Sequence, residues 1–190
     1  KIYGWTFTDK QSEHRLVHSE HTNEVTSVLP WEKGKILFSG GQDKKLVCWN
    51  VPYEKPERIR KFDAAVSNIK QNPIDENVIL IGLCARDNQL HVMDCRTSEV
   101  VLKLSGQFTG SMSPTQLTQC NWHPDGYTIA MGGEPQVVNL WDIRYVKPEK
   151  PFQTLMLHNK DMRVYQSAFM SPKLMTTIAA DKRIGIHVLR

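Results

Sequence analysis

The sequence contains no run of about 18 apolar residues, the length that a membrane-spanning helix needs. Its first residues also lack the pattern of a secretory signal peptide. No dense block of lysine and arginine is present either, because the 24 basic and 20 acidic residues are spread along the chain and leave a net charge of only +4. These absences argue against a membrane protein and against a basic nucleic-acid-binding arm. We therefore expect a soluble intracellular protein, cytoplasmic or nuclear.

Motifs for metal, redox and phosphate chemistry are missing as well. The four cysteines never form a Cys-x-x-Cys pair, and we find no glycine-rich phosphate loop and no paired carboxylates. Because Cys48, Cys84, Cys95 and Cys120 lie in apolar segments, we expect buried free thiols in a reducing compartment. We predict no metal site, no cofactor and no enzymatic activity.

What the sequence does contain is an internal repeat. One apolar segment ending near a tryptophan recurs along the chain, and its reference residue moves by 44, 44, 48 and 46 residues through the series Trp5, Trp49, Met93, Trp141 and His187. A period near 45 suits either a four-stranded propeller blade or a pair of helices. Each unit breaks into short β-branched or aromatic runs separated by Gly, Pro, Asn and Asp turns, which excludes helical repeats.

The first complete unit shows this texture best. We predict strands over residues 25–29, 36–39, 46–49 and 57–62, with turns between them. Such units are small antiparallel sheets arranged around an axis. The predicted fold class is therefore all-β.

Residues 20–51 resemble a complete WD repeat. The family pattern opens with Gly-His and closes with Trp-Asp, and this unit has Glu20-His21 and Trp49-Asn50 in those places. The resemblance implies a WD-repeat β-propeller with four blades present, forming part of a seven-bladed ring. We expect one propeller segment over residues 1–190, with repeat units at 8–51, 52–96, 97–144 and 145–190. Residues 1–7 would be the third strand of a preceding blade.

Three residues of this unit, His21, Ser39 and Asp43, match the residue types of a hydrolase triad. The WD resemblance implies instead that they form a buried structural network with Trp49. Carried over to the other units, that network would include Asp87 in the second, Trp141 in the third, and His158, Thr177 and Asp181 in the fourth, where His187 stands at the Trp position.

Function on a rigid propeller is expected at loops and strand ends. The family resemblance implies a partner-binding rim made of Glu24, Thr26, Gln42, Ala65, Ser67, Arg86, Gln116, Thr118, Glu134, Arg163, Tyr165 and Ala180. Among these, Arg86, Arg163 and Tyr165 are of residue types enriched at binding hot spots. The long connection 105–115, with Phe108 and Met112, is either a tolerated insertion or a partner-contacting loop.

Two units end in Asp-x-Arg, which places Arg96 and Arg144 in corresponding positions, and Arg190 matches them in the fourth unit. This ending resembles the motif by which WD-repeat substrate receptors dock on the adaptor of cullin-RING ubiquitin ligases. The leading hypothesis is a non-catalytic protein–protein interaction scaffold, with that receptor role as one form of it. The alternatives are a subunit of another nuclear or cytoplasmic assembly, or a basic-faced propeller that contacts nucleic acid.

Overall fold

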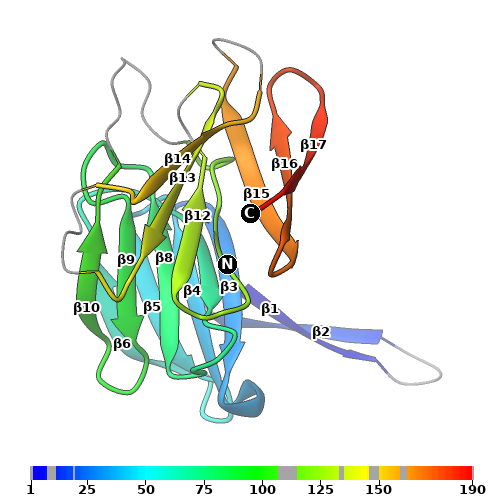
Figure 1. Ribbon diagram of the computed structural model, residues 1–190. Helices are drawn as coiled ribbons and strands as arrows, with labels where there is room; N and C mark the ends of the chain where they lie inside the picture. Colours follow the sequence, from blue (N-terminus) through cyan, green and yellow to red (C-terminus); the bar gives the residue numbers. More distant parts are fainter. Residues whose placement is uncertain are drawn as a thin grey trace.

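The computed structural model describes residues 2–7, 12–18, 20–106, 115–132, 135–145, 150–158 and 162–189. Apart from one short 3-10 turn, η1 (Glu32–Gly34), every regular element in these residues is a β-strand, so the all-β prediction is confirmed. The strands form antiparallel sheets in which each strand pairs with its neighbour in sequence. Figure 1 shows these sheets standing side by side.

Three sheets have four strands and one has three. Sheet 1 consists of β3 (Val25–Trp31), β4 (Ile36–Gly41), β5 (Lys45–Asn50) and β6 (Lys55–Lys61), and sheet 2 of β7 (Val66–Gln71), β8 (Val78–Leu83), β9 (Leu90–Asp94) and β10 (Glu99–Leu104). Sheet 3 consists of β11 (Cys120–Trp122), β12 (Thr128–Met131), β13 (Val137–Asp142) and β14 (Gln153–Met156). Sheet 4 consists of β15 (Val164–Ser171), β16 (Leu174–Ala179) and β17 (Ile184–Val188).

A separate two-stranded sheet pairs β1 (Ile2–Phe7) with β2 (Ser12–His18). In sheet 1 the observed strands follow the predicted ones closely, and each extends beyond its predicted bounds at one end or both. The largest difference is the outer strand, which begins two residues before the predicted 57–62 and ends one residue earlier. Its side chains are mostly exposed, so burial contributes little to its bounds, and pairing with β5 sets them.

The hydrophobic core lies between the sheets. The middle strands β4, β8 and β12 are mostly buried. Strands β8 and β12 have a sheet on either side, and β4 packs against sheet 2. One cluster joins sheet 1 to sheet 2 around Phe38 and Ile79, a second joins sheet 2 to sheet 3 around Leu80 and Ile129, and a third joins sheet 3 to sheet 4 around Leu140. Each sheet therefore has its apolar face covered only when its neighbour is in place.

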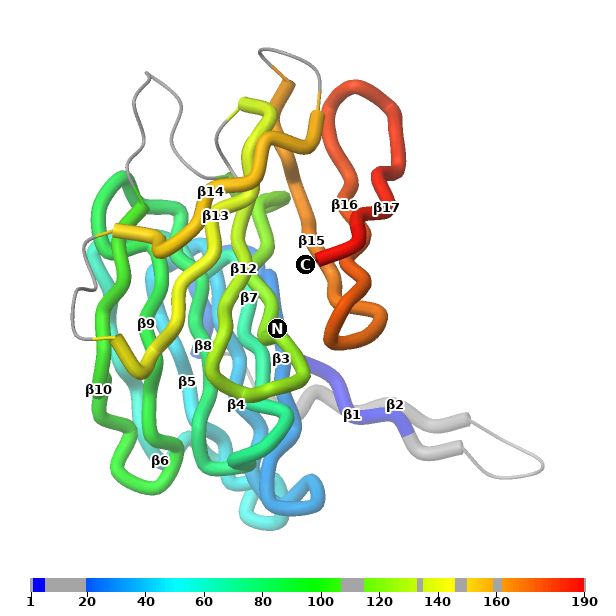
Figure 2. The backbone as a smooth tube through the Cα atoms, in the orientation of Figure 1, coloured from blue at the N-terminus to red at the C-terminus, as the bar shows by residue number. Residues whose placement is uncertain are grey.

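The first strands of the sheets, β3, β7, β11 and β15, lie next to one another and are tied by side chains (Figure 2). The Thr26 hydroxyl donates to the Val66 carbonyl at 2.6 Å, and the Asn68 amide donates to the Cys120 carbonyl at 2.8 Å. Each of these bonds runs from a side chain of one sheet to a backbone carbonyl of the next. They also hold sheet 1 against sheet 2, and sheet 2 against sheet 3, at a defined position along the strands.

A glycine marks the place where neighbouring sheets approach most closely. Gly40, Gly82 and Gly132 occupy the same position in the second strand region of sheets 1, 2 and 3. A Cβ added at Gly132 would lie 2.5 Å from the Val164 carbonyl oxygen, closer than real Cβ atoms come. The absence of a side chain therefore lets sheet 4 pack against sheet 3.

Among the described residues, no helix is long and apolar enough to cross a membrane.

Candidate functional site

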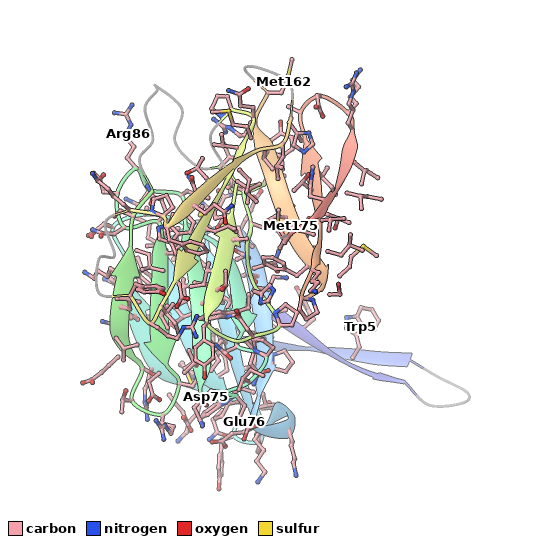
Figure 3. The ribbon with its side chains drawn as sticks, viewed as in Figure 1. Trp5, Asp75, Glu76, Arg86, Met162 and Met175 are labelled. Carbon is pink, nitrogen blue, oxygen red and sulfur yellow. The ribbon has the colours of Figure 1, made fainter. Side chains whose placement is uncertain are left out.

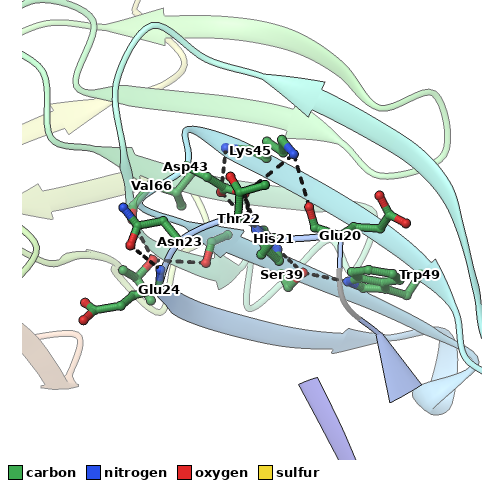
Figure 4. A network of polar contacts seen from close by, with 12 residues as sticks. Glu20, His21, Thr22, Asn23, Glu24, Ser39, Asp43, Lys45, Trp49 and Val66 are labelled. Carbon is green, nitrogen blue, oxygen red and sulfur yellow. Dashed lines mark hydrogen bonds and ion pairs between the residues drawn. The ribbon is translucent and has the colours of Figure 1, made fainter. Parts of the chain in front are cut away.

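The triad-like residues of sheet 1 form one hydrogen-bonded chain. His21 places Nδ1 at 3.0 Å from Asp43 Oδ1 and Nε2 at 2.8 Å from Ser39 Oγ, and the Trp49 indole donates to Ser39 Oγ at 2.6 Å (Figure 4). The side chains of His21 and Asp43 are 1% and 3% exposed, and Ser39 is fully buried. A hydroxyl that already accepts a hydrogen bond from an indole inside the sheet has no access to a substrate.

Asp43 stays ionised in this setting. Burial on its own would raise its pKa, but the hydrogen bonds from His21 and from the Thr22 amide, at 3.0 Å, lower the pKa below its usual value. The Lys45 amide also donates to this carboxylate, and the Lys45 ammonium lies 3.8 Å from it. Asp43 therefore joins the segment before β3 to the turn between β4 and β5.

Sheet 4 contains the same arrangement with one substitution. His158 Nδ1 lies 3.0 Å from Asp181 Oδ2, and its Nε2 lies 2.7 Å from the Thr177 hydroxyl. His187, at the position of the tryptophan in sheet 1, lies 2.8 Å from the same hydroxyl through its Nε2. Burial and the neighbouring His158 lower the pKa of His187. A neutral imidazole here replaces the indole as a partner of the hydroxyl.

Sheets 2 and 3 do not form this network, which corrects two expectations. Asp87 is exposed, and nearby Phe62 packs against His91. Trp141 is buried, but its indole donates to the Ser105 carbonyl of sheet 2's last segment at 3.1 Å. Since Met131 offers no hydroxyl at the position of Ser39, the indole has found a partner in the neighbouring sheet instead.

The predicted rim residues differ in exposure. Arg86, Gln116 and Glu24 are exposed, while Gln42, Arg163 and Tyr165 are half-buried. Arg86 lies at one end of the sheets together with Met162, opposite Asp75 and Glu76 (Figure 3). This end therefore offers several long polar side chains to solvent.

Three rim expectations need correction. Ser67 and Thr118 are buried, and the Thr118 hydroxyl accepts the Thr115 amide at 3.1 Å, so neither faces a partner. The half-buried Thr26 uses its hydroxyl to hold the next sheet. Inward-facing positions of the first strands pack between sheets, which a position-by-position transfer does not reveal. Glu134, Phe108 and Met112 lie outside the described residues.

The Asp-x-Arg arginines lie at the end opposite Arg86. The Cys95 amide bonds to the Asn77 carbonyl there, next to Asp75 and Glu76. Each guanidinium is held by the aspartate two residues earlier: Arg96 Nη2 lies 2.6 Å from Asp94, and Arg144 Nη2 lies 2.5 Å from Asp142. The bond from Arg96 lowers the pKa of Asp94 to about 2. Both guanidinium groups remain largely exposed and have a set direction.

The cysteines are free thiols, three of them buried and Cys84 half-buried. Burial raises the pKa of Cys48 to about 11 and that of Cys95 and Cys120 to about 12, so these sulfurs stay protonated. Within the described ranges, no group of three or more His, Cys, Asp or Glu side chains is placed to hold a metal ion.

Sequence reasoning missed one cationic feature, the pair Arg58 and Arg60 on β6. Both reach across to sheet 2, where Arg58 Nη1 donates to the Arg96 carbonyl at 2.8 Å and Arg60 donates to the Ser98 carbonyl. The available signal was their alternate spacing in a predicted outer strand, which places both on one face.

Comparison with known proteins agrees with the fold. The family model "WD domain, G-beta repeat" matches residues 12–50 and 102–142. Pre-mRNA-processing factor 19 of Bos taurus is 27% identical over 139 residues, which cover 72% of this chain and 26% of that protein. The anaphase-promoting complex subunit cdc20 of Dictyostelium discoideum is 25% identical over 187 residues, covering 96% of this chain and 35% of that protein. The chain thus spans about a third or less of these relatives.

Solved structures show the same architecture. A chain of the mitotic checkpoint complex superposes with a TM-score of 0.69 at 22% identity, over 89% of this chain and 50% of that one. The Cps50 (Swd1) β-propeller domain of Myceliophteria thermophila superposes with a TM-score of 0.66 at 17% identity, over 90% of this chain and 53% of that one. The family model thus detects WD repeats at residues 12–50 and 102–142, and the matching solved structures show that the chain has the fold of a WD-repeat β-propeller.

Proposed function

We propose that this chain is a non-catalytic scaffold that holds other proteins together. The observation that carries the proposal is that the most enzyme-like residues, His21, Ser39 and Asp43, are hydrogen-bonded to one another in a buried network. The ends of the sheets, by contrast, present long polar and cationic side chains to solvent. A rigid body with such ends is suited to binding and not to turnover.

The relatives support a place in a multiprotein assembly. Their names include an anaphase-promoting complex subunit and a small ribosomal subunit protein, the latter from Schizosaccharomyces pombe. We propose an assembly in the nucleus or cytoplasm for this chain too. The partners would bind at the rim that carries Arg86.

The rim is tested by the triple variant Arg86→Ala/Arg163→Ala/Tyr165→Ala. Loss of two cations and one aromatic ring at one face should cost about 1–2 kcal/mol per hot-spot residue, enough to lower the recovery of partners by tenfold or more. The measurement is affinity purification of the protein followed by quantitative mass spectrometry. Glu76→Ala, at the opposite end, is the control and should retain the same partners. Unchanged recovery with the triple variant would place the partner surface elsewhere.

A receptor role in a cullin-RING ubiquitin ligase is a second candidate. It is favoured because the ion pairs with Asp94 and Asp142 orient the exposed guanidinium groups of Arg96 and Arg144. If the adaptor binds there, Arg96→Ala/Arg144→Ala should abolish its co-purification, because each guanidinium would lose a charge-assisted contact. Arg96→Lys/Arg144→Lys keeps the charge and should recover only part of the binding. Adaptor recovery that survives the alanine pair would rule out these arginines as the docking point.

A further inference from the structure

A cationic seam runs along the outside of the molecule where sheets 1 and 2 meet. It is formed by Arg58 and Arg60 of β6 on one side and by Lys103 of β10 on the other. Arg58 donates to the Arg96 carbonyl at 2.8 Å and to the Ser98 hydroxyl at 3.1 Å, and Arg60 donates to the Ser98 carbonyl. The two arginines thus span the seam and stand between the outer strands.

The cations of this seam are not held in ion pairs among the described residues, although carboxylates lie in the same region. The acceptors of both arginines are carbonyl and hydroxyl oxygens, and within the part of the chain that the structure describes no carboxylate forms an ion pair with Arg58, Arg60 or Lys103. Behind them lies His91, which is buried and pairs with Lys103 in the β9–β10 ladder. The pKa of His91 is lowered to about 4, mainly by burial and also by the charges of Lys103 and Arg60. The charge of Asp63 has the opposite effect. An anion placed here would meet three cations of one sign.

The spacing of the arginines indicates the form of that anion. Arg58 and Arg60 are alternate residues of one strand, so their side chains leave the same face about 6.6 Å apart. An extended polypeptide repeats its own side chains at the same interval. Acidic side chains at alternate positions of such a segment would therefore meet the two guanidinium groups in register.

A pocket opens at one end of the seam. It has a volume of about 410 Å³, and Trp31, Ile36, Cys48 and Cys95 supply its apolar floor, while Arg58 belongs to its wall. Glu32 and Glu57 also line it, and Glu57 accepts a hydrogen bond from Asn50. These carboxylates disfavour an acidic side chain inside the pocket but leave room for an apolar one.

We propose that the seam between β6 and β10 binds an extended acidic segment of a partner protein, with an apolar side chain in the Trp31 pocket and alternate carboxylates on Arg58, Arg60 and Lys103. The proposal rests on the scaffold function only in that the partner is a protein. It concerns a lateral surface that is separate from the Arg86 rim and adjoins one arginine of the Asp-x-Arg pair, because Arg96 also lines the pocket.

The test is fluorescence anisotropy of the protein with a labelled peptide in which leucine is followed by glutamates at alternate positions. Arg58→Gln/Arg60→Gln keeps an amide donor toward the Ser98 region and removes two charges, so binding should weaken about tenfold or more. Lys55→Gln/Lys61→Gln removes the same charge from the same strand and should bind as the unaltered protein does. Lys103→Gln, on the other side of the seam, should weaken binding by a smaller factor. This variant keeps the proposal testable if the Arg58→Gln/Arg60→Gln protein does not fold.

Two peptide variants and one nucleic acid complete the test. A peptide with glutamine in place of glutamate should fail to bind, and one with serine in place of leucine should bind more weakly. Equal losses in the Arg58/Arg60 and Lys55/Lys61 variants would overturn the proposal, since they would reveal general charge attraction. Preferred binding of single-stranded DNA through the same arginines would overturn it in favour of a nucleic-acid site. The Arg86 rim variant should bind the peptide normally, so failure of the rim and failure of the seam are separable results.

Discussion

Asp43→Ala should lower the stability of the protein by about 3 kcal/mol. The substitution leaves the buried His21 imidazole without its carboxylate partner, and an unpaired buried polar group costs about 1–3 kcal/mol. It also removes the acceptor of the exposed Thr22 amide. For a domain of this size the melting temperature should fall by about 6–12 °C. Thermal unfolding followed by circular dichroism measures the change.

Asp87→Ala is the matched control, because this residue stands at the same turn position in sheet 2 but is exposed. Its effect should stay within about 0.5 kcal/mol. The pH dependence gives a second check. Since the pKa of Asp43 is lowered on folding, its contribution is present above the ordinary aspartate pKa of about 3.9 and is lost as the pH falls through the folded value. The difference between the unaltered protein and Asp43→Ala should therefore be full at neutral pH and shrink in acid.

An esterase activity abolished by Ser39→Ala at unchanged melting temperature would contradict the structural role of the network. It would mean that the Ser39 hydroxyl can be reached by a substrate.

Gly132→Ala should have an effect of similar size for a different reason. The added methyl group would lie 2.5 Å from the Val164 carbonyl oxygen and 2.9 Å from the Val164 Cβ, so the backbone of sheet 4 must move away from sheet 3. Overpacking of this kind costs about 1–3 kcal/mol, and contact with a backbone atom places it at the upper end. Denaturant unfolding gives the free energy directly.

Ile178→Ala is a suitable comparison, because Ile178 takes the place of this glycine in sheet 4 and is 46% exposed. The loss there should stay below about 1 kcal/mol. A Gly132→Ala protein as stable as the unaltered one would show that sheets 3 and 4 can separate at no cost.

The sequence predicted the fold well because its signals are local. Turn residues, β-branched runs and the recurring segment that ends in Trp49 each report on a few neighbouring residues, and these set the strands of sheet 1. The polar chain from His21 to Trp49, and its variant with His187, also follows from repeat position, since those residues face one another inside a single sheet.

Contacts between sheets were harder to predict. Whether Thr118 faces solvent or the next sheet depends on residues in a different repeat. The Trp141 indole shows the same limit, since its acceptor belongs to sheet 2. Arg58 and Arg60 were overlooked because an outer strand rich in charge is ordinarily just a solvated face.

The clusters that lie between sheets make this molecule a linear series of coupled units. Among the described residues, each of the three apolar clusters joins two sheets that are neighbours in sequence, so each of these sheets is stabilised by the neighbour with which it shares an interface. Energetic changes in sheet 1 and at the border of sheets 3 and 4 should therefore add when combined. Cooperativity in such a series depends on the weakest junction, and a partner that bridges two sheets from outside would strengthen the junction that it spans.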